Sequence, residues 1–254
     1  MTRPSTSFQV LSDLHLELNL QYHCYDIPIC ADHLILAGDI GRLADYDEYR
    51  KFLQKQTDRF KYVFLVLGNH EFYNGTFATG LEKPQQLERE PCFEGRLIVL
   101  HRKRYDVPQE IVQMKVKDFQ KIEAWSVDDH NANYDADLAW LLNEINSTHL
   151  ENGTVGTRRE QKSILVVTHH APLLRATSSP QHVGSPWSVA FATDVLPQIP
   201  DGVDVWVFGH THYSTDFMEG EVRVMSNQRG YALPWNTSKK TQDEFDVKKV
   251  IRVS

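Results

Sequence analysis

Short apolar runs followed directly by polar side chains are the dominant pattern along this chain. In residues 63–67, β-branched, aromatic and aliphatic residues follow one another without a polar interruption. Such runs are typical of strands buried on both faces, as in a parallel sheet. Gly68 then allows a sharp turn, after which come Asn69 and His70. Ligands of open α/β sheets bind outside the carboxyl ends of the strands, so this turn is a candidate site.

Four further apolar runs end in the same way. Residues 8–11, 34–37, 164–167 and 205–208 lead into Asp13 and His15, Asp39, His169 and His170, and His210 and His212, respectively. A polar turn after one strand is common. A whole set of strand ends that all supply carboxylate, amide or imidazole groups indicates a shared metal site.

Helical periodicity separates these runs, and the fold class is therefore α/β. Residues 44–60 and 135–150 carry apolar side chains at helical spacing, which predicts amphipathic helices. Residues 75–90 form a third helical region, which we expect to be interrupted at Pro84. Strands that alternate with helices favour a largely parallel sheet.

Other strands are predicted from shorter signals. Residues 97–100 are a short apolar run, and residues 111–112 and 119–127 are further strand candidates. Residues 215–218 and 221–225 flank a Glu-Gly pair and predict a hairpin.

Length and composition fit one large domain. The 254 residues, with 41% hydrophobic and 24% charged side chains, are sufficient for one well-buried core. We expect a single domain over residues 1–254, with its core at about 8–230 and a peripheral segment at 231–254. Residues 173–193 are rich in Ser, Thr, Pro and Ala, and long loops of this kind are often functional lids or disordered.

Net charge, cysteine content and apolar run lengths indicate which binding partners, cross-links and cellular location to expect. The formal net charge of -7 disfavours a sequence-specific nucleic-acid module, because such modules neutralise phosphates with basic side chains. Three cysteines do not form a disulfide framework. The first seven residues lack the apolar stretch of a signal peptide, and no run has the length of a membrane span. We therefore expect a cytoplasmic protein.

The polar blocks resemble those of a known family. Asp13-x-His15, Gly38-Asp39, Gly68-Asn69-His70-Glu71, His169 and Gly209-His210-x-His212 occur in the order found in calcineurin-like metallophosphoesterases. The resemblance covers roughly residues 8–230. It implies two stacked mixed β-sheets flanked by helices, with two divalent metal ions between the sheets.

The resemblance also implies which side chains hold the ions. The first ion would be bound by Asp13, His15, Asp39 and His212, and the second by Asp39, Asn69, His169 and His210. Asp39 would bridge the two ions. His169 is preferred to His170 because the family uses the first histidine of its block.

The types of donor in this set indicate which metals it binds and what reaction the site can support. Imidazole, carboxylate and amide ligands suit Mn, Zn, Fe, Co or Ni rather than Ca. Two carboxylates and a bridging hydroxide leave two divalent ions with a net positive charge, which attracts a phosphate ester. Metal binding lowers the pKa of water to about 7 and supplies the nucleophile. The family resemblance gives His70 the role of proton donor to the leaving alkoxide.

Two differences from known subfamilies of these metallophosphoesterases restrict the expected class of enzyme and type of metal centre. The block Gly38-Asp39-Ile40-Gly41-Arg42 lacks the second Asp of protein Ser/Thr phosphatases. Arg42 occupies the position where purple acid phosphatases carry a tyrosine. Neither a protein phosphatase nor an iron–tyrosinate centre is therefore expected.

The predicted activity is hydrolysis of small phosphodiesters or cyclic nucleotides through a metal-bridging hydroxide. Two alternatives remain, a phosphomonoesterase of small molecules and a non-catalytic protein-binding scaffold. Contact with substrate is left open for a group of basic side chains, namely Arg42, His130, His170, His182 and Arg229. The stretch from Asn227 to Tyr231 resembles one that follows the last histidines of the family. In it we expect Gly230 to serve the backbone, and Asn227 and Arg229 to face the site.

Overall fold

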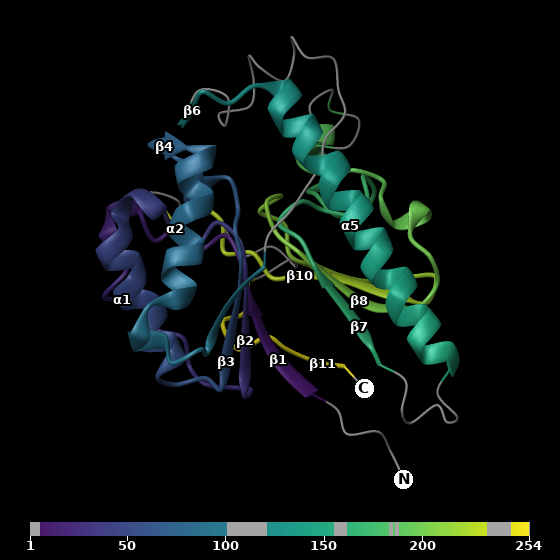
Figure 1. Cartoon of the computed structure of the whole chain (residues 1–254), viewed down its shortest axis with the longest axis horizontal. Helices are drawn as coiled ribbons and strands as arrows, with labels where there is room; N and C mark the ends of the chain where they lie inside the picture. The colour runs from purple at the N-terminus through teal and green to yellow at the C-terminus, as the bar shows by residue number, and fades with distance from the viewer. Residues whose placement is uncertain are drawn as a thin grey trace.

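The protein has four layers, in which two β-sheets face each other and helices cover the outer face of each (Figure 1). The computed structural model describes residues 6–100, 121–154, 162–182, 185, 188–232 and 245–253. Within these ranges, none of the helices is both long enough and apolar enough to span a bilayer. The expected architecture of two stacked sheets flanked by helices is confirmed.

The first sheet has the strand order β11-β1-β2-β3-β5. Its strands are β1 (Thr6–Leu11), β2 (His33–Ala37), β3 (Tyr62–Val66), β5 (Leu97–Leu100) and β11 (Val250–Val253). Neighbouring strands from β1 to β5 are parallel, and β11 pairs antiparallel with β1. The uninterrupted apolar runs form the parallel strands of this sheet, because strands that are covered on both faces need apolar side chains on both faces.

The second sheet has the order β7-β8-β10-β9. It consists of β7 (Ile164–Val167), β8 (Val203–Phe208), β9 (Thr215–Glu219) and β10 (Val222–Ser226). β7, β8 and β10 are parallel, while β9 and β10 form the predicted antiparallel hairpin. A third, two-stranded sheet joins β4 (Gly75–Thr76) and β6 (Ile122–Glu123).

Three apolar layers hold the sheets and helices together. Between the sheets, Val10 and Ile35 pack with Val207 and Met225. On the outer face of the first sheet lie α1 (Tyr46–Thr57) and α2 (Phe77–Arg89). On the outer face of the second sheet, α5 (Val127–Thr154) packs over Trp206 (Figure 1). At about 25 cal/mol per Å² of apolar surface, these layers are the main source of stability.

Short 3₁₀ turns connect these elements. They are η1 (Leu18–Leu20), η2 (Leu43–Asp45), η3 (His70–Phe72), η4 (Pro91–Phe93), η5 (Pro180–His182), η6 (Ser188–Ala190) and η7 (Leu196–Gln198). Two of them, η5 and η6, fall within the 173–193 segment, so the described part of this segment contains regular turns.

Several boundaries differ from the prediction. Helix α2 runs through Pro84 instead of being interrupted there. Helix α5 begins eight residues before position 135. The strand candidate at 119–127 is described from residue 121 onward, and within that part only the two residues of β6 form a strand. Residues 111–112 lie outside the described residues.

The C-terminal segment was expected to be peripheral, but part of it belongs to the first sheet. Strand β11 pairs with β1 over Thr6 to Gln9, and the side chain of Ile251 is buried between the sheets. Strand β11 has four residues, one of them charged, so its own sequence gives little strand signal. Its partner β1 is more than 240 residues away, so no local pattern could predict the pairing.

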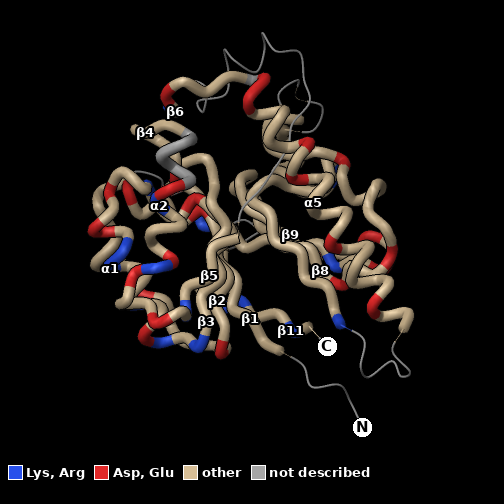
Figure 2. The backbone as a smooth tube through the Cα atoms, in the orientation of Figure 1, with Lys and Arg blue, Asp and Glu red and all other residues tan. Residues whose placement is uncertain are grey.

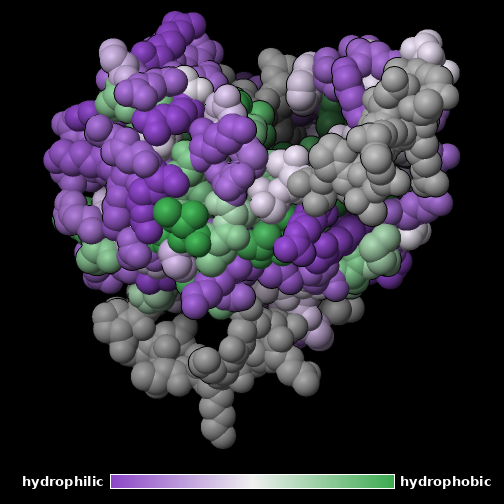
Figure 3. Space-filling model, turned by 90° about the horizontal axis from the view of Figure 1, so that it is seen from below, coloured by the Kyte–Doolittle hydropathy of each residue, from purple (hydrophilic) through white to green (hydrophobic). Residues whose placement is uncertain are grey.

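The surface is polar, and its charges are unevenly distributed. Helix α5 carries acidic side chains and no Lys or Arg, and Figure 2 shows red segments along it. Within the described part of the chain, the Lys and Arg positions lie mainly around α1 and the lower end of the first sheet (Figure 2). Seen from below, the molecule is largely hydrophilic, with hydrophobic side chains gathered near the middle of that face (Figure 3).

Candidate metal centre

The predicted ligands all follow the carboxyl ends of parallel strands. Asp13 and His15 follow β1, Asp39 follows β2, Asn69 follows β3, His169 follows β7, and His210 and His212 follow β8. Since the two sheets stack face to face, these strand ends meet between them. The loops are joined by backbone hydrogen bonds, such as those from the amide of Asp13 to the carbonyl of Gly38 and from the amide of Gly209 to the carbonyl of His169.

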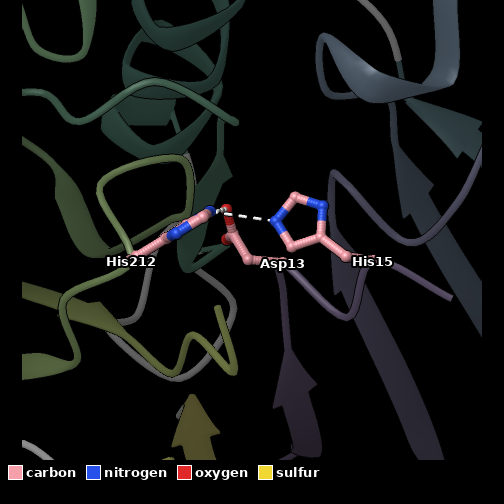
Figure 4. Close-up of side chains that lie close together, drawn as sticks. All are labelled: Asp13, His15 and His212. Carbon is pink, nitrogen blue, oxygen red and sulfur yellow. Dashed lines mark hydrogen bonds and ion pairs between the residues drawn. The ribbon is translucent and has the colours of Figure 1, made fainter. Parts of the chain in front are cut away.

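One half of the cluster is formed by Asp13, His15 and His212 (Figure 4). The Nε2 atoms of His15 and His212 are 2.9 Å apart. Nε2 of His212 lies 3.4 Å from Oδ1 of Asp13. Nε2 of His15 lies 4.0 Å from Oδ2 of Asp39, which links this half to the other.

The other half is formed by Asp39, His169 and His210, with Asn69 beside them. Nε2 of His169 lies 3.4 Å from Oδ1 of Asp39 and 3.2 Å from Oδ1 of Asn69. Nδ1 of His210 lies 3.1 Å from Nε2 of His169. Each predicted ligand therefore has a donor atom within 4.0 Å of a donor atom of another ligand, and these contacts form one continuous network with Asp39 at its centre.

The far nitrogens of two histidines are held by backbone carbonyls. Nδ1 of His169 is 3.0 Å from the carbonyl of Ala37, and Nε2 of His210 is 3.2 Å from the carbonyl of Ala190. A carbonyl only accepts, so each of these nitrogens carries the proton. The opposite nitrogen then presents its lone pair to the cluster, as a metal ligand must. Ala190 lies in the 173–193 segment, which therefore contributes to the site.

The chemistry of the donors fits two divalent ions. Two imidazole nitrogens that face each other at about 3 Å without an intervening proton are unfavourable unless a cation lies between them. Burial and the neighbouring His169 lower the pKa of His210 well below its usual value, which keeps this ring neutral. Zinc-type ions take such nitrogen and oxygen donors at about 2.0–2.2 Å, which is compatible with ligand atoms about 3 Å apart.

The backbone at the site is strained. Among the predicted ligands, positive φ angles occur at Asp13 (52°), His15 (48°), Asp39 (54°), His210 (72°) and His212 (51°). This left-handed conformation costs a non-glycine residue about 1–3 kcal/mol, and such strain concentrates at functional sites. The loops are therefore shaped to direct side chains into the cluster and not to minimise their own energy.

Two glycines make room for the ligands. A Cβ atom on Gly38 would overlap the ring of His169, and one on Gly68 would overlap the carboxylate of Asp39. Gly38 also has a φ of +88°, which favours glycine. The Gly residues before Asp39 and Asn69 thus permit the close approach of the strand ends.

Glu71 holds the loop that carries Asp39. Its carboxylate accepts hydrogen bonds from the backbone amides of Asp39, Ile40 and Gly68 at 3.0, 2.8 and 2.7 Å. The hydroxyl of Tyr49 donates a further bond at 3.0 Å. Burial and the charge of Asp39 raise the pKa of Glu71. Glu71 therefore acts as a fixed anchor behind the site.

His70 lies beside the cluster and has a carboxylate behind it. Its Nδ1 is 2.7 Å from Oε1 of Glu17, while its Nε2 is 3.1 Å from the hydroxyl of Tyr231 and 4.0 Å from Oδ2 of Asp39. Burial opposes the charged form of His70, but Asp39 and Glu17 outweigh it and raise the pKa to about 9. A protonated His70 directed at the cluster is suited to donate a proton.

Sequence reasoning missed Glu17 and Tyr231. Glu17 stands two residues after His15, so an Asp-x-His-x-Glu pattern was the available signal. The ring centroid of Tyr231 lies 4.5 Å from that of His15 and 4.6 Å from that of His212. The available signal was the family-like stretch from Asn227 to Tyr231, in which no role was assigned to Tyr231. Gly230 has a φ of +68°, which confirms its expected backbone role.

Other expected contacts have different partners. The side chain of Asn227 bonds to the backbone of Val10 and Asp246, so the expectation that it faces the site is wrong. Arg42 forms a bidentate pair with Asp45. Arg229 donates to the carbonyl of Leu14 and to Gln21, which makes it a brace of the loop after β1.

The remaining histidines lie near or outside the cluster. His170 has its Nε2 3.2 Å from the carbonyl of Ala190, and it lines a cavity of about 410 Å³ between α5 and β7. The ring of His130, on α5, is 6.0 Å from that of His170. His182 belongs to η5 and joins none of the ligand groups found among the described residues.

Comparison with known proteins identifies the family. The family model for calcineurin-like phosphoesterase matches residues 7–214. The chain belongs to the calcineurin-like phosphoesterase family. An uncharacterized protein of Acanthamoeba polyphaga mimivirus is 25% identical over 272 residues, which cover 87% of this chain and 90% of that protein.

One solved structure shows the same fold for this calcineurin-like phosphoesterase. The phosphopantetheinyl hydrolase of Mycobacterium tuberculosis has a TM-score of 0.60 at 18% identity, over 99% of this chain and 97% of that one. A dimetal phosphatase from Danio rerio has a TM-score of 0.45 at 12% identity, over 87% and 86% of the two chains. Family membership makes this protein a metal-dependent phosphoesterase whose His and Asp clusters suit a dinuclear centre.

Proposed function

We propose that this protein hydrolyses small phosphodiesters, including cyclic nucleotides, at a dinuclear centre held by the strand-end cluster. The proposed ligands are Asp13, His15, Asp39, Asn69, His169, His210 and His212, with Mn, Zn or Fe as the metal. The observation that carries the proposal is the unbroken chain of donor atoms, none further than 4.0 Å from its neighbour, around the carboxylate of Asp39.

The charge of the cluster favours a phosphoester substrate. The predicted ligands include only two carboxylates, Asp13 and Asp39, and both are fully or nearly fully buried. The other ligands are neutral, so a pair of divalent ions would keep a positive charge here that attracts phosphate oxygens. When bound, the ions supply Lewis-acid stabilisation and lower the pKa of water.

His70 is the proposed proton donor. Its Nε2 faces Oδ2 of Asp39 at 4.0 Å, so it lies next to the place where the phosphoryl group would bind. Without metal, burial opposes its charged form, but Asp39 and Glu17 raise the pKa of His70 to about 9, which favours the protonated ring. Donation to the leaving alkoxide would contribute about 10²–10⁴-fold to the rate.

The test of the substrate class compares two chromogenic esters. Protein stripped of metal is refilled with Mn, Zn, Fe(II), Co or Ni, and initial rates are measured on bis-p-nitrophenyl phosphate and p-nitrophenyl phosphate. We expect the diester to be hydrolysed faster, followed by turnover of cyclic nucleotides. Faster hydrolysis of the monoester would instead identify a phosphomonoesterase. A folded protein that is inactive with every metal would contradict the proposal and favour a protein-binding scaffold.

The role of His70 is tested by the leaving group. His70→Ala should reduce hydrolysis of an alkyl phosphodiester by about 10²-fold or more, because an alkoxide needs a proton to leave. The same variant should reduce hydrolysis of a p-nitrophenyl ester much less, because nitrophenolate is a good leaving group. Equal losses on both esters would remove the proton-donor role.

A further inference from the structure

The most informative side chain outside the predicted ligand set is Glu17. It follows β1 by six residues and its side chain is only 4% exposed. A buried carboxylate is costly unless hydrogen bonds or charges compensate it. The compensation here comes from two histidines of the site, His15 and His70.

A single oxygen of Glu17 faces both rings. Oε1 is 2.7 Å from Nδ1 of His70 and 3.6 Å from Nδ1 of His15. The two rings are in edge contact, with centroids 4.3 Å apart. On the opposite side of each ring, Nε2 faces the cluster at 4.0 Å from Oδ2 of Asp39. Glu17 therefore lies behind both rings, and Asp39 lies in front of them.

This placement determines which nitrogens carry protons. A carboxylate only accepts hydrogen bonds, so Nδ1 of His70 must be the donor to Glu17. Nδ1 of His15 makes no hydrogen bond within the described part of the chain, and Oε1 of Glu17 is the carboxylate oxygen that faces it. With Nδ1 protonated, Nε2 of His15 is left with its lone pair directed toward His212.

We propose that Glu17 is a positioning residue that orients two histidines at once, His70 as the proton donor and His15 as a ligand. This inference rests on the proposed function and adds a residue to it. In metal sites, a carboxylate behind a histidine ligand fixes the ring and its tautomer, and its loss costs about 10–100-fold in affinity or activity. Here one carboxylate would connect such a ligand with the acid of the reaction.

The experiment compares three side chains at position 17. Glu17→Met removes the acceptor while keeping an unbranched chain, and Glu17→Gln retains an acceptor without the charge. With metal at a saturating concentration, we expect losses on an alkyl phosphodiester of about 10–100-fold for Met and smaller losses for Gln. A p-nitrophenyl ester should be affected less by both variants. Equal losses on the two esters in both variants would overturn the positioning of His70.

A double-mutant cycle tests whether Glu17 acts through His70. In a His70→Ala background, Glu17→Met should cost less than about threefold in alkyl ester hydrolysis at saturating metal, because the group that it orients is already absent. If the two losses instead multiply, Glu17 does not act through His70, and that part of the proposal is overturned.

A readout independent of activity uses the metal-free protein. Two-bond ¹H–¹⁵N spectra of histidine-labelled protein report ring protonation, with His70→Ala identifying the His70 signal. We expect Nδ1 of His70 to be protonated in the wild type and this pattern to change in Glu17→Met. An unchanged pattern in a folded Glu17→Met variant would overturn the inference. Should the Met variant not fold, the Gln variant carries the comparison, with a weaker Nδ1–H hydrogen bond as the expected result.

The chain offers a matched control. Glu48 lies 3.0 Å from Nδ1 of His23, and both side chains are partly exposed, at 32% and 66%. Glu48→Met removes a carboxylate from a histidine away from the cluster, so it should leave the His70 signal and both rates unchanged. If the wild-type protein hydrolyses neither ester, the proposed function fails, whereas the spectra still decide whether Glu17 orients His70.

Discussion

At the residue scale, the site depends on buried carboxylates with different tasks. Asp39 faces the cluster, Glu71 holds the backbone behind it, and Glu17 lies behind two histidines. Burial would raise the pKa of Glu17, but the adjacent His15 and His70 rings outweigh it and lower the pKa to about 2. Each carboxylate is therefore stabilised by a different set of donors.

Glu71 provides a stability prediction at this scale. Glu71→Ala leaves the amides of Asp39, Ile40 and Gly68 without their acceptor. Each unsatisfied buried group costs about 1–3 kcal/mol, so we expect a loss of about 3 kcal/mol or more in the free energy of unfolding. Urea unfolding measures this loss, with the partly exposed Glu48→Ala as the control. A loss below about 1 kcal/mol would contradict the anchoring role.

At the element scale, an ionic cluster joins the two sheets at their edges. Asp216 on β9 accepts a bidentate pair of bonds from Arg223 on β10, both at 2.8 Å. Lys249, next to β11 of the first sheet, lies 2.8 Å from the same carboxylate. Burial opposes ionisation of Asp216, but these two cations lower its pKa below 3.8. The C-terminal strand is thus tied to the second sheet as well as to β1.

This cluster predicts a pH dependence. The lowered pKa of Asp216 means that its contribution is fully present above its unfolded pKa and is lost as pH falls through the lower folded pKa. Asp216→Asn should therefore reduce the free energy of unfolding by about 1 kcal/mol at neutral pH, with the difference shrinking below about pH 4. Urea unfolding at several pH values measures it, and Asp47→Asn, from an exposed pair, is the control. A difference that is constant with pH would refute the ionic explanation.

At the scale of the whole molecule, the metal centre couples the two sheets. Its predicted ligands come from the ends of β1, β2 and β3 in one sheet and of β7 and β8 in the other. Ions bound there would hold the sheets together at their carboxyl edges. The strained backbone of five of these ligands would be compensated in part by metal binding.

Metal removal should therefore lower thermal stability. At a free metal concentration about 100 times the Kd, binding adds about 2.7 kcal/mol, which corresponds to a Tm increase of roughly 5–10 °C for a chain of this size. Calorimetry before and after treatment with a chelator measures the shift. Asp39→Asn should remove most of it, whereas Asp47→Asn should retain it. A wild-type Tm that does not respond to metal would count against the proposed ligand set.

Local patterns in the sequence determined the strands, their parallel arrangement and the donor types. Apolar runs, glycine turns and the Asp, Asn and His residues after them are properties of five to ten consecutive positions, so they can be recognised without the fold. The family resemblance then supplied the two-sheet architecture and the ligand roles. Helix ends and Pro84 were less well predicted, because tertiary packing overrides local propensity there.

Only the tertiary structure decided which distant groups meet. The amide of His210 bonds to the carboxylate of Asp13, which is 197 positions earlier in the chain. The carbonyl of Ala190 holds His210, and the hydroxyl of Tyr231 meets His70. Such contacts depend on the stacking of two sheets that are separate in sequence, and no local periodicity encodes that stacking. The sequence by itself therefore determined the kind of chemistry, while the packing of the sheets determined the partners that orient it.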